Sequence, residues 1–448
     1  MNNIDTIISI ATPMGTGALS VIRCSGTRVS EIIETFFKKK LPARQACYLN
    51  FKSEERVVDD VIAIYYVAPK SYTGEEMLEI MCHGGPVVYQ LIIKEILKLN
   101  DCRIAKAGEF TERAFLNNKM SLTEAESICA LINAKTEAAA LAARESLSGK
   151  MTKDLFQIDN VILKTRVQVE ALLDFSDEDI ETEGIKEISS HIEDCKKEIL
   201  RNLEKLETNK LLFETSKVAV IGKPNTGKSS LTNYLTDEEV SIVNTKAGTT
   251  RDVVSKMFSL NGAPVTILDT AGIRETNDLI EKEGKEKAIK QAALANITLF
   301  LYDARVGIDQ EDLEILNNVK QASSNILVIA NKIDLIEKDK LDNIIKNDPG
   351  ILCISIKENI NMDILKVKIL DCLKLSVRDS SPGVYNIKNI EHLNKAFQEI
   401  NDIQVNLNEL EVIAERLKNS QKHISAVLDN DDEERVLSGI FSNFCIGK

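Results

Sequence analysis

The chain has no apolar run close to the roughly 20 residues that a membrane-spanning helix needs. Its first residues, MNNIDTIISIATP, lack the basic segment and the long apolar segment of a secretory signal peptide. The nine cysteines are scattered without a CxxC pair, which argues against a disulfide framework or a zinc site and is typical of a reduced, intracellular protein. We therefore expect a cytoplasmic protein that does not use a membrane.

Excess positive charge is also missing. The chain carries 69 acidic and 56 basic side chains, for a formal net charge of −13. This balance argues against a general nucleic-acid coat, although a local basic patch can still meet RNA. The 448 residues contain 28% charged residues and no low-complexity tract, so we expect a soluble globular protein of about two to three domains.

The first 118 residues alternate short apolar runs with glycine turns. Amphipathic helices are predicted at Arg28–Lys39 and Pro86–Leu99. Strands are predicted at Ile4–Ala11, Ala18–Arg23, Cys47–Phe51 and Val57–Val67. This mixture is typical of an α+β domain, which we assign to residues 1–118.

Residues 119–213 change to helical periodicity. Ser121 and Glu124 have the spacing of a capping box at a helix start. Long helices are then predicted at Val161–Leu173 and Ile188–Leu212. Taken alone, this region reads as a helical bundle or spacer.

Helices return in residues 376–448, where apolar spacing predicts them at Ile390–Leu417 and Glu433–Phe444. Because the two helical segments share their character, we expect them to pack together as one helical domain. Residues 214–375 would then be a domain inserted into it.

That inserted block alternates strands and helices, as a parallel α/β sheet requires. Its predicted strands are Val218–Ile221, Val265–Leu268, Ile297–Leu301, Ile326–Ala330 and Ile351–Ile354. A polar motif follows most of these strands, and the carboxyl ends of the strands are where such sheets bind ligands.

The first motif is Gly222-x-x-x-x-Gly227-Lys228-Ser229, between a strand and the helix-like run Ser230–Leu235. This is the context of a phosphate-binding loop, in which glycines let backbone N–H groups point at a phosphate. Lys228 would reach the β- and γ-phosphates, and the Ser229 hydroxyl would hold Mg²⁺. The alternative is an ordinary strand-turn-helix connection, but the other motifs of a nucleotide site follow in order.

The second motif selects the base. In Asn331-Lys332-Ile333-Asp334, the carboxylate can accept two hydrogen bonds from guanine N1–H and N2–H₂, a donor pair that adenine lacks. Ser355-Ile356-Lys357 would support the base from the next loop. We therefore predict GTP and GDP as the ligands.

Magnesium and the γ-phosphate involve two more segments. Asp269-Thr270-Ala271-Gly272 would supply a carboxylate near Mg²⁺ and an N–H group toward the γ-phosphate, and Thr250 would complete the Mg²⁺ shell. Ile273 stands where Ras-like enzymes place a water-orienting glutamine. Glu281 could orient water instead, or could be a helix-start carboxylate favoured by the helix dipole, and the residues alone leave both open.

Four further stretches are distinctive. They are Ala11-Thr12-Pro13 with Gly15-x-Gly17 and Arg23-x-Ser25-Gly26, then Thr73-Gly74-Glu75 with His83-Gly84-Gly85-Pro86, then Gly108-Glu109-Phe110-Thr111-x-Arg113, and the terminal Phe444-Cys445-Ile446-Gly447-Lys448. With these, the chain resembles the MnmE (TrmE) family of tRNA-modifying GTPases over essentially its full length. The resemblance implies a folate-binding N-terminal domain that dimerises, a helical domain and an inserted Ras-like G domain.

The resemblance also implies site residues. Arg23, Glu79, Lys119 and Lys448 match positions that contact a 5-formyltetrahydrofolate-type or methylenetetrahydrofolate ligand. For K⁺ it implies Asn225, Asn244, Lys246 and Thr249, and for water orientation Glu281, while Cys445 matches a cysteine needed for modification. The residues assigned to the nucleotide are Asn225, Thr226, Gly227, Lys228, Ser229, Ser230, Asn244, Thr245, Lys246, Ala247, Gly248, Thr249, Thr250, Asp269, Thr270, Ala271, Gly272, Asn331, Lys332, Asp334, Ser355, Ile356 and Lys357.

The implied reaction is addition of a (carboxymethyl)aminomethyl group to C5 of the wobble uridine (U34) of certain tRNAs. It implies a homodimer that works with the flavoprotein MnmG (GidA) in a heterotetrameric complex, with GTP hydrolysis driving a conformational cycle. Two alternatives stay open. One is a ribosome-assembly GTPase, although no GxxG clamp follows residue 375. The other is a folate-dependent aminomethyl transferase with a regulatory G domain.

Overall fold

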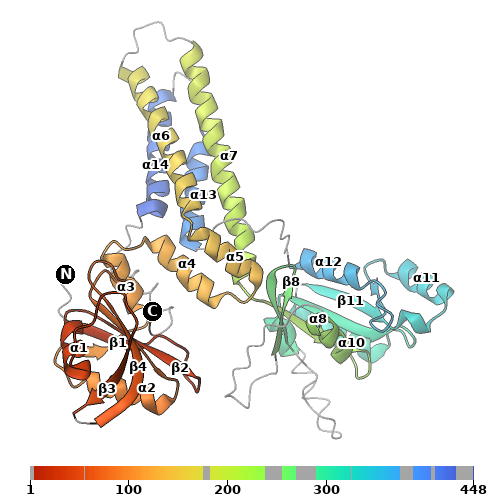
Figure 1. Ribbon diagram of the computed structural model, residues 1–448. Coiled ribbons are helices and arrows are strands. Elements are labelled where there is room, and N and C mark those ends of the chain that lie inside the picture. Colours follow the sequence, from red (N-terminus) through yellow and green to blue (C-terminus); the bar gives the residue numbers. More distant parts are fainter. Residues whose placement is uncertain are drawn as a thin grey trace. The chain divides into compact units, whose positions relative to one another are not determined.

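The computed structural model describes residues 5–54, 56–174, 182–237, 255–268, 289–323, 325–373, 387–404, 409–429 and 447. The chain divides into two units, Met1–Cys129 with Asp429–Lys448 and Ala130–Leu428. Figure 1 shows the elements in sequence colours. None of the helices in the described ranges is both long enough and apolar enough to cross a bilayer.

The first unit contains a six-stranded sheet in the order β3-β4-β5-β2-β1-β6. All neighbours are antiparallel except β1 and β6, which are parallel. Its strands are β1 Thr6–Ile10, β2 Leu19–Ser25, β3 Cys47–Ser53, β4 Arg56–Tyr66, β5 Met77–His83 and β6 Cys102–Ile104. The four predicted strands are confirmed. The prediction missed β5, whose apolar sequence contains the charged Glu79, and β6, which has only three residues.

Helices cover one face of this sheet. α1 (Val29–Phe37) buries side chains at helical spacing, and α2 (Pro86–Ile96) packs into the same apolar core. Phe36 of α1 stacks on Phe51 of β3 with ring centroids 4.6 Å apart. Both predicted helices are confirmed with ends within a few residues, and the unpredicted α3 (Glu109–Leu116) follows β6. The opposite face, which we call the open face, carries Arg23 of β2 and Glu79 of β5, and α3 covers part of it through Phe110, which packs on Ile7 of β1.

The helical segments are α4 Leu122–Asn133, α5 Glu137–Ser146, α6 Lys150–Asp174, α7 Thr182–Phe213, α13 Ile387–Asn401 and α14 Leu410–Asp429. The capping box before α4 is confirmed, because Ser121 N–H donates to Glu124 Oε2 (2.7 Å) and Glu124 N–H donates to Ser121 Oγ (3.2 Å). Helices α6, α7, α13 and α14 lie side by side in Figure 1 and share one apolar core. Residues on both sides of the inserted block thus build a single bundle.

The single helix predicted over Ile390–Leu417 is wrong. The structure has α13 and α14 there, with Asp402–Gln404 between them in the described part of the break. Asn401 and Asp402 have short polar side chains that compete with helical backbone hydrogen bonds and favour turns. The predicted helix Glu433–Phe444 lies outside the described residues.

The inserted block holds the second sheet, in the order β12-β11-β10-β7-β9-β8. Its strands are β7 Ser216–Ile221, β8 Ser255–Leu260, β9 Ala263–Leu268, β10 Ile297–Asp303, β11 Ile326–Asn331 and β12 Leu352–Cys353. The five predicted strands are confirmed and are mutually parallel. The sheet is nevertheless not wholly parallel, because β8 pairs antiparallel with β9 at one edge. Asn261 and Gly262, both with positive φ, form the hairpin turn that the Asn-Gly pair favours.

In its described residues, the helices of this block are α8 Lys228–Asp237, α10 Gln310–Ala322, α11 Lys338–Asn347 and α12 Met362–Cys372, with the short helix η1 Ile333–Leu335. Apolar side chains of this block pack into two separate cores, and the strands contribute residues to both cores. Parallel strands of this kind place their carboxyl ends along one edge of the sheet. The loops after β7, β10, β11 and β12 therefore share that edge.

Candidate guanine-nucleotide site

Backbone geometry makes two glycines of the loop after β7 irreplaceable. Gly222 has φ +153°, and a Cβ on it would lie 2.1 Å from the carbonyl oxygen of Leu301 on β10. Gly227 has φ +104°, and a Cβ there would lie 2.3 Å from Asn331 Nδ2. Side chains cannot occupy such space, so both positions require glycine. The loop is thereby pressed against the ends of β10 and β11.

Polar contacts then fix the curvature of the loop. Thr226 Oγ1 donates to the Lys223 carbonyl oxygen (2.9 Å), and the Lys228 ammonium donates to the same oxygen (2.6 Å). Lys228 thus spans the loop from the first residue of α8. Asn225 and Ser229 are exposed at its rim. The curled backbone, the ammonium and an accessible Ser229 hydroxyl fit a Mg²⁺-bound phosphate chain.

The Asn331-Lys332 pair at the end of β11 holds this loop in place. Buried Asn331 donates from Nδ2 to the Thr226 carbonyl oxygen (2.9 Å). The Lys332 ammonium donates to the Asn225 carbonyl oxygen (2.6 Å) and lies 2.8 Å from Asp303 Oδ2. Both side chains therefore join the base-recognition motif to the phosphate loop.

Asp334 is oriented by its neighbour on the next loop. The hydroxyl of Ser355, which is fully buried, donates to Asp334 Oδ1 (2.6 Å) and accepts from the Glu358 N–H (3.2 Å). The carboxylate of Asp334 is partly exposed, so its remaining acceptor capacity can meet two parallel donors. The Lys357 side chain is 80% exposed and lies near Glu358 rather than Asp334.

Asp334→Asn should change base selectivity. An amide offers one acceptor and one donor, which mismatches the two donors of guanine but matches the N1–H and C2 carbonyl of xanthine. GTP affinity should fall by about 10³–10⁴-fold while xanthosine triphosphate gains affinity. Nucleotide titrations would measure this, with Asp339→Asn, an exposed carboxylate of α11, as the matched control. Unchanged preference for GTP would rule out Asp334 as the base-reading group.

Two supporting residues were missed by the sequence reasoning. Asp303, at the end of β10, accepts hydrogen bonds from Arg305 and Lys332. These bonds hold the pKa of Asp303 well below its usual range, and the bond from Arg305 contributes most. Its place at the carboxyl end of a buried strand was a signal that could have found it. Lys223 pairs with Asp309 (2.6 Å) and Glu311 (2.8 Å) at the start of α10, and these contacts raise its pKa. No local pattern points to Lys223.

A second group of predicted residues gathers on the open face of the first sheet. Arg23 and Glu79 are register partners on β2 and β5, and Arg23 donates from Nε (3.0 Å) and Nη2 (2.8 Å) to Glu79 Oε1. Tyr66 donates to Glu79 Oε2 (3.1 Å). The Arg23 guanidinium also lies 5.2 Å from the ring centroid of Tyr72 and 5.7 Å from that of Phe110. This half-buried polar pair beside aromatic rings suits a flat ligand with carbonyl or carboxylate groups.

Lys119 lies at the loop that carries Tyr72. Its ammonium donates to the Pro69 carbonyl oxygen (2.9 Å), and its stem limits the space at Gly74, where a Cβ would meet Lys119 Cγ at 3.1 Å. The chain's penultimate residue, Gly447, is buried in the same unit. A Cβ on Gly447 would lie 2.0 Å from the Ile10 carbonyl oxygen at the end of β1.

The remaining predicted site residues lie outside the described residues, so their roles stay predictions. They are Asn244, Thr245, Lys246, Ala247, Gly248, Thr249, Thr250, Asp269, Thr270, Ala271, Gly272, Glu281, Cys445 and Lys448.

Comparisons with known proteins agree along the whole chain. Residues 6–119 match the family model of the GTP-binding protein TrmE N-terminus, and residues 122–445 match that of the MnmE helical domain. The tRNA modification GTPase MnmE of Francisella tularensis subsp. holarctica (strain OSU18) is 37% identical over 454 residues, covering 99% of both chains. The protein of the same name from Francisella philomiragia is 36% identical over 452 residues, again with 99% of both chains covered.

Solved structures match smaller parts. Era of Aquifex aeolicus bound to GDP and AlF₄⁻ is 31% identical and covers 42% of this chain and 67% of its own, with a TM-score of 0.30. The G domain of the T. maritima FeoB iron transporter is 23% identical and covers 36% of this chain and 99% of its own, with a TM-score of 0.26.

Proposed function

The chain belongs to the MnmE family of tRNA modification GTPases, and on that premise we propose that it hydrolyses GTP to drive modification at C5 of the wobble uridine (U34) of tRNA. The observation that carries the GTPase part is the junction of three motifs at one sheet edge. There the phosphate loop, the Asn331-Lys332 pair and the Ser355-oriented Asp334 are joined by hydrogen bonds.

Each nucleotide contact follows from a described position. The backbone N–H groups between Gly222 and Lys228 would bind the phosphates, with the Lys228 ammonium exchanging its carbonyl partner for a phosphate oxygen. Asp334 would accept from guanine. Ser229 and Thr250 would hold Mg²⁺, which when bound would neutralise charge between the phosphates.

We assign water orientation to Glu281, since Ile273 cannot polarise water. Asn225, exposed at the rim of the loop, would hold K⁺ together with Asn244, Lys246 and Thr249. A monovalent cation there supplies the positive charge that an arginine supplies in other GTPases. Family membership and the rim position of Asn225 support this proposal.

The Arg23–Glu79 pair is the proposed folate site, with Lys119 and Lys448. Arg23 uses Nε and Nη2 on Glu79, so it keeps a further donor for a ligand oxygen. Tyr72 and Phe110 offer apolar surface beside it. Folate would supply the one-carbon unit when bound, and Cys445 would act in the modification step.

An apolar row beside this pair supports the proposed homodimer. Tyr48, Ile62, Met81 and Val21 are register neighbours across β3, β4, β5 and β2, on the face that carries Arg23 and Glu79. Tyr48 is 73% exposed and Ile62 is 38% exposed. A second copy of this chain would cover that row. The flavoprotein MnmG is the proposed further partner, and the proposed domains are residues 1–118, 119–213 with 376–448, and 214–375.

The test is mass spectrometry of nucleosides from total tRNA of cells that lack this protein. Loss of 5-aminomethyl-type uridines, restored by the wild type but not by Glu281→Ala or Cys445→Ser, would support the proposal. An unchanged nucleoside profile in the deletion strain would refute the tRNA role. Ribosome profiles and folate-transfer assays would then test the two alternatives.

The variant Gly447→Ala should affect folate binding without affecting GTP hydrolysis. An alanine at φ +97° is strained, and its Cβ would collide with the Ile10 carbonyl oxygen, so the tail must move. We expect at least about a tenfold loss of folate binding, since a shift of about 1 Å at a site can cost 10²-fold, with GTP hydrolysis unchanged. Gly149→Ala, also at positive φ but in open space, is the control. Normal folate binding by Gly447→Ala would show that the C-terminal tail does not contribute to the proposed folate site.

A further inference from the structure

Three consecutive lysines, Lys38, Lys39 and Lys40, follow helix α1. They are the longest run of basic residues in the chain, whose net charge is −13. Lys38 adopts a left-handed conformation (φ 51°) that ends the helix and turns the chain. All three side chains are exposed, and within the described ranges their ammonium groups have no ion-pair or hydrogen-bond partner. Positive charge is therefore concentrated there and uncompensated by direct contacts.

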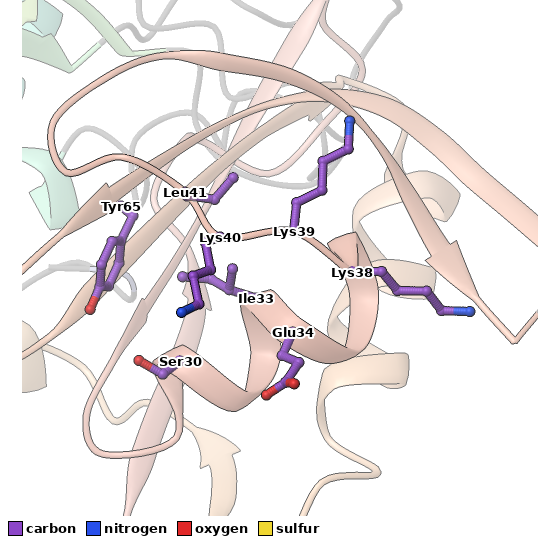
Figure 2. A pocket seen from close by; sticks show the side chains of 8 residues that line it. All are labelled: Ser30, Ile33, Glu34, Lys38, Lys39, Lys40, Leu41 and Tyr65. Atoms are coloured by element: carbon purple, nitrogen blue, oxygen red, sulfur yellow. The ribbon is translucent and has the colours of Figure 1, made fainter.

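The lysines border a hollow of about 610 Å³. Its lining also includes Ile33, Leu41, Tyr65 and the carboxylate-bearing Glu34. Figure 2 shows Lys40 turned toward Ser30, whereas Lys38 and Lys39 extend outward. The hydroxyls of Ser30 and Tyr65 already bond to Glu76 (2.9 and 2.8 Å), so the lysines supply the available donors. The volume lies within the range of small-ligand sites.

The hollow is separate from the Arg23–Glu79 pair. Tyr65 and Tyr66 are adjacent on β4, so they point to opposite faces of the sheet. Tyr66 bonds to Glu79 on the open face, whereas Tyr65 packs beside the core under the helices. A ligand at the lysines would therefore leave the proposed folate site accessible.

We infer that Lys38, Lys39 and Lys40 contact phosphates of the tRNA backbone, with the hollow taking part of a nucleotide. The inference rests on the proposed tRNA function and adds where the RNA is held. An acidic protein repels RNA over most of its surface, so binding requires a local cluster of unpaired cations. Lysine suits phosphates as a point charge and carries no base specificity, so these contacts would position the tRNA rather than select it.

The test compares the full-length protein with the triple variant Lys38→Gln, Lys39→Gln, Lys40→Gln. Binding of an unmodified tRNA transcript would be followed by fluorescence anisotropy between about 50 and 200 mM KCl. Each lost phosphate contact lowers the slope of log K against log salt by about 0.7–0.9, so the slope should fall by about 2–3. Affinity at the lower salt should fall by about 10- to 100-fold.

A charge-matched control is Lys52→Gln, Lys94→Gln, Lys106→Gln, three exposed lysines elsewhere in the same unit. It should keep most of the affinity, and both triple variants should keep wild-type GTP hydrolysis and unfolding temperature. If both triple variants lose the same affinity for tRNA, or if the Lys38, Lys39, Lys40 variant binds tRNA like the wild type, the proposed lysine contact is wrong. The proposed tRNA function would not be affected by that outcome. If the wild type binds no tRNA, the proposed function fails together with this inference.

Discussion

Arg113→Met is expected to lower the free energy of unfolding by about 3–5 kcal/mol, because it removes one partner of a buried ion network. The Arg113 side chain is 2% exposed. Its Nη2 donates to Asp5 Oδ1 (2.7 Å) and Glu109 Oε1 (3.1 Å), and its Nη1 lies 3.2 Å from Glu75 Oε1. Without the guanidinium, the buried carboxylate of Glu109 keeps only part of its compensation, from Arg103 and the Lys106 N–H. The same network joins Asp5 before β1, Glu75 in the loop between β4 and β5, and α3, so its loss should also loosen the proposed folate site.

The network gives this prediction a pH signature. Burial tends to raise the pKa of Asp5, but hydrogen bonds from Arg103 and Arg113 outweigh it and lower the pKa overall. The pKa of Glu109 is lowered in the same way: burial tends to raise it, and the hydrogen bond from Arg103 is the main opposing effect. A lowered folded pKa means stability that is present above the unfolded pKa and is lost as pH falls through the folded value. The difference between wild type and variant should therefore shrink below about pH 4.

Tyrosine signals suit the measurement, since the chain has no tryptophan and five of its eight tyrosines lie in the first 118 residues. Urea unfolding at neutral and acid pH, followed by near-ultraviolet circular dichroism, would give the loss. Arg28→Met is the matched control, because Arg28 pairs with Glu31 and Asp101 at the exposed surface. It should leave the midpoint nearly unchanged. An equally small effect for Arg113→Met would show that the network is not a stabilising unit.

Lys228→Ala should lower kcat/KM for GTP by about 10²–10³-fold, the usual cost of removing one donor from a charge-stabilising site. The Lys228 ammonium lies over the phosphate loop, bonded to the Lys223 carbonyl oxygen at 2.6 Å. Replacing it removes the positive charge nearest the proposed phosphates. The loop itself should keep its shape, because Thr226 Oγ1 still bonds to the same oxygen and Asn331 still bonds to Thr226.

Phosphate release under multiple-turnover conditions would measure this loss, with nucleotide binding measured in parallel. Lys256→Ala is the control, since Lys256 on β8 bonds only to exposed Asn233 Oδ1 (2.8 Å) among the described contacts. It should hydrolyse GTP as the wild type does. Retained activity in Lys228→Ala with lost activity in Lys256→Ala would place the phosphate site elsewhere.

Features that depend on neighbouring residues could be predicted from the sequence. The strand before Gly222, the helix after Gly227 and the capping box of Ser121 and Glu124 all follow from local backbone preferences and periodicity. The two fold classes and the helical bundle followed in the same way. The antiparallel β8 was missed although the Asn261-Gly262 turn marks it locally.

Features that depend on long-range pairing were decided by the tertiary structure. Arg23 and Glu79 are 56 residues apart and meet only through the register of β2 and β5. Asn331 donates to the Thr226 carbonyl oxygen, 105 residues away in the sequence. A residue of the predicted base-recognition motif therefore also stabilises the predicted phosphate-binding loop. No local pattern encodes such contacts, because they depend on which strands pair and how deeply each polar group is buried. The sequence by itself determined the motifs and the family. Packing decided which residues each motif contacts, as the close approach of Gly447 to the Ile10 carbonyl oxygen also shows.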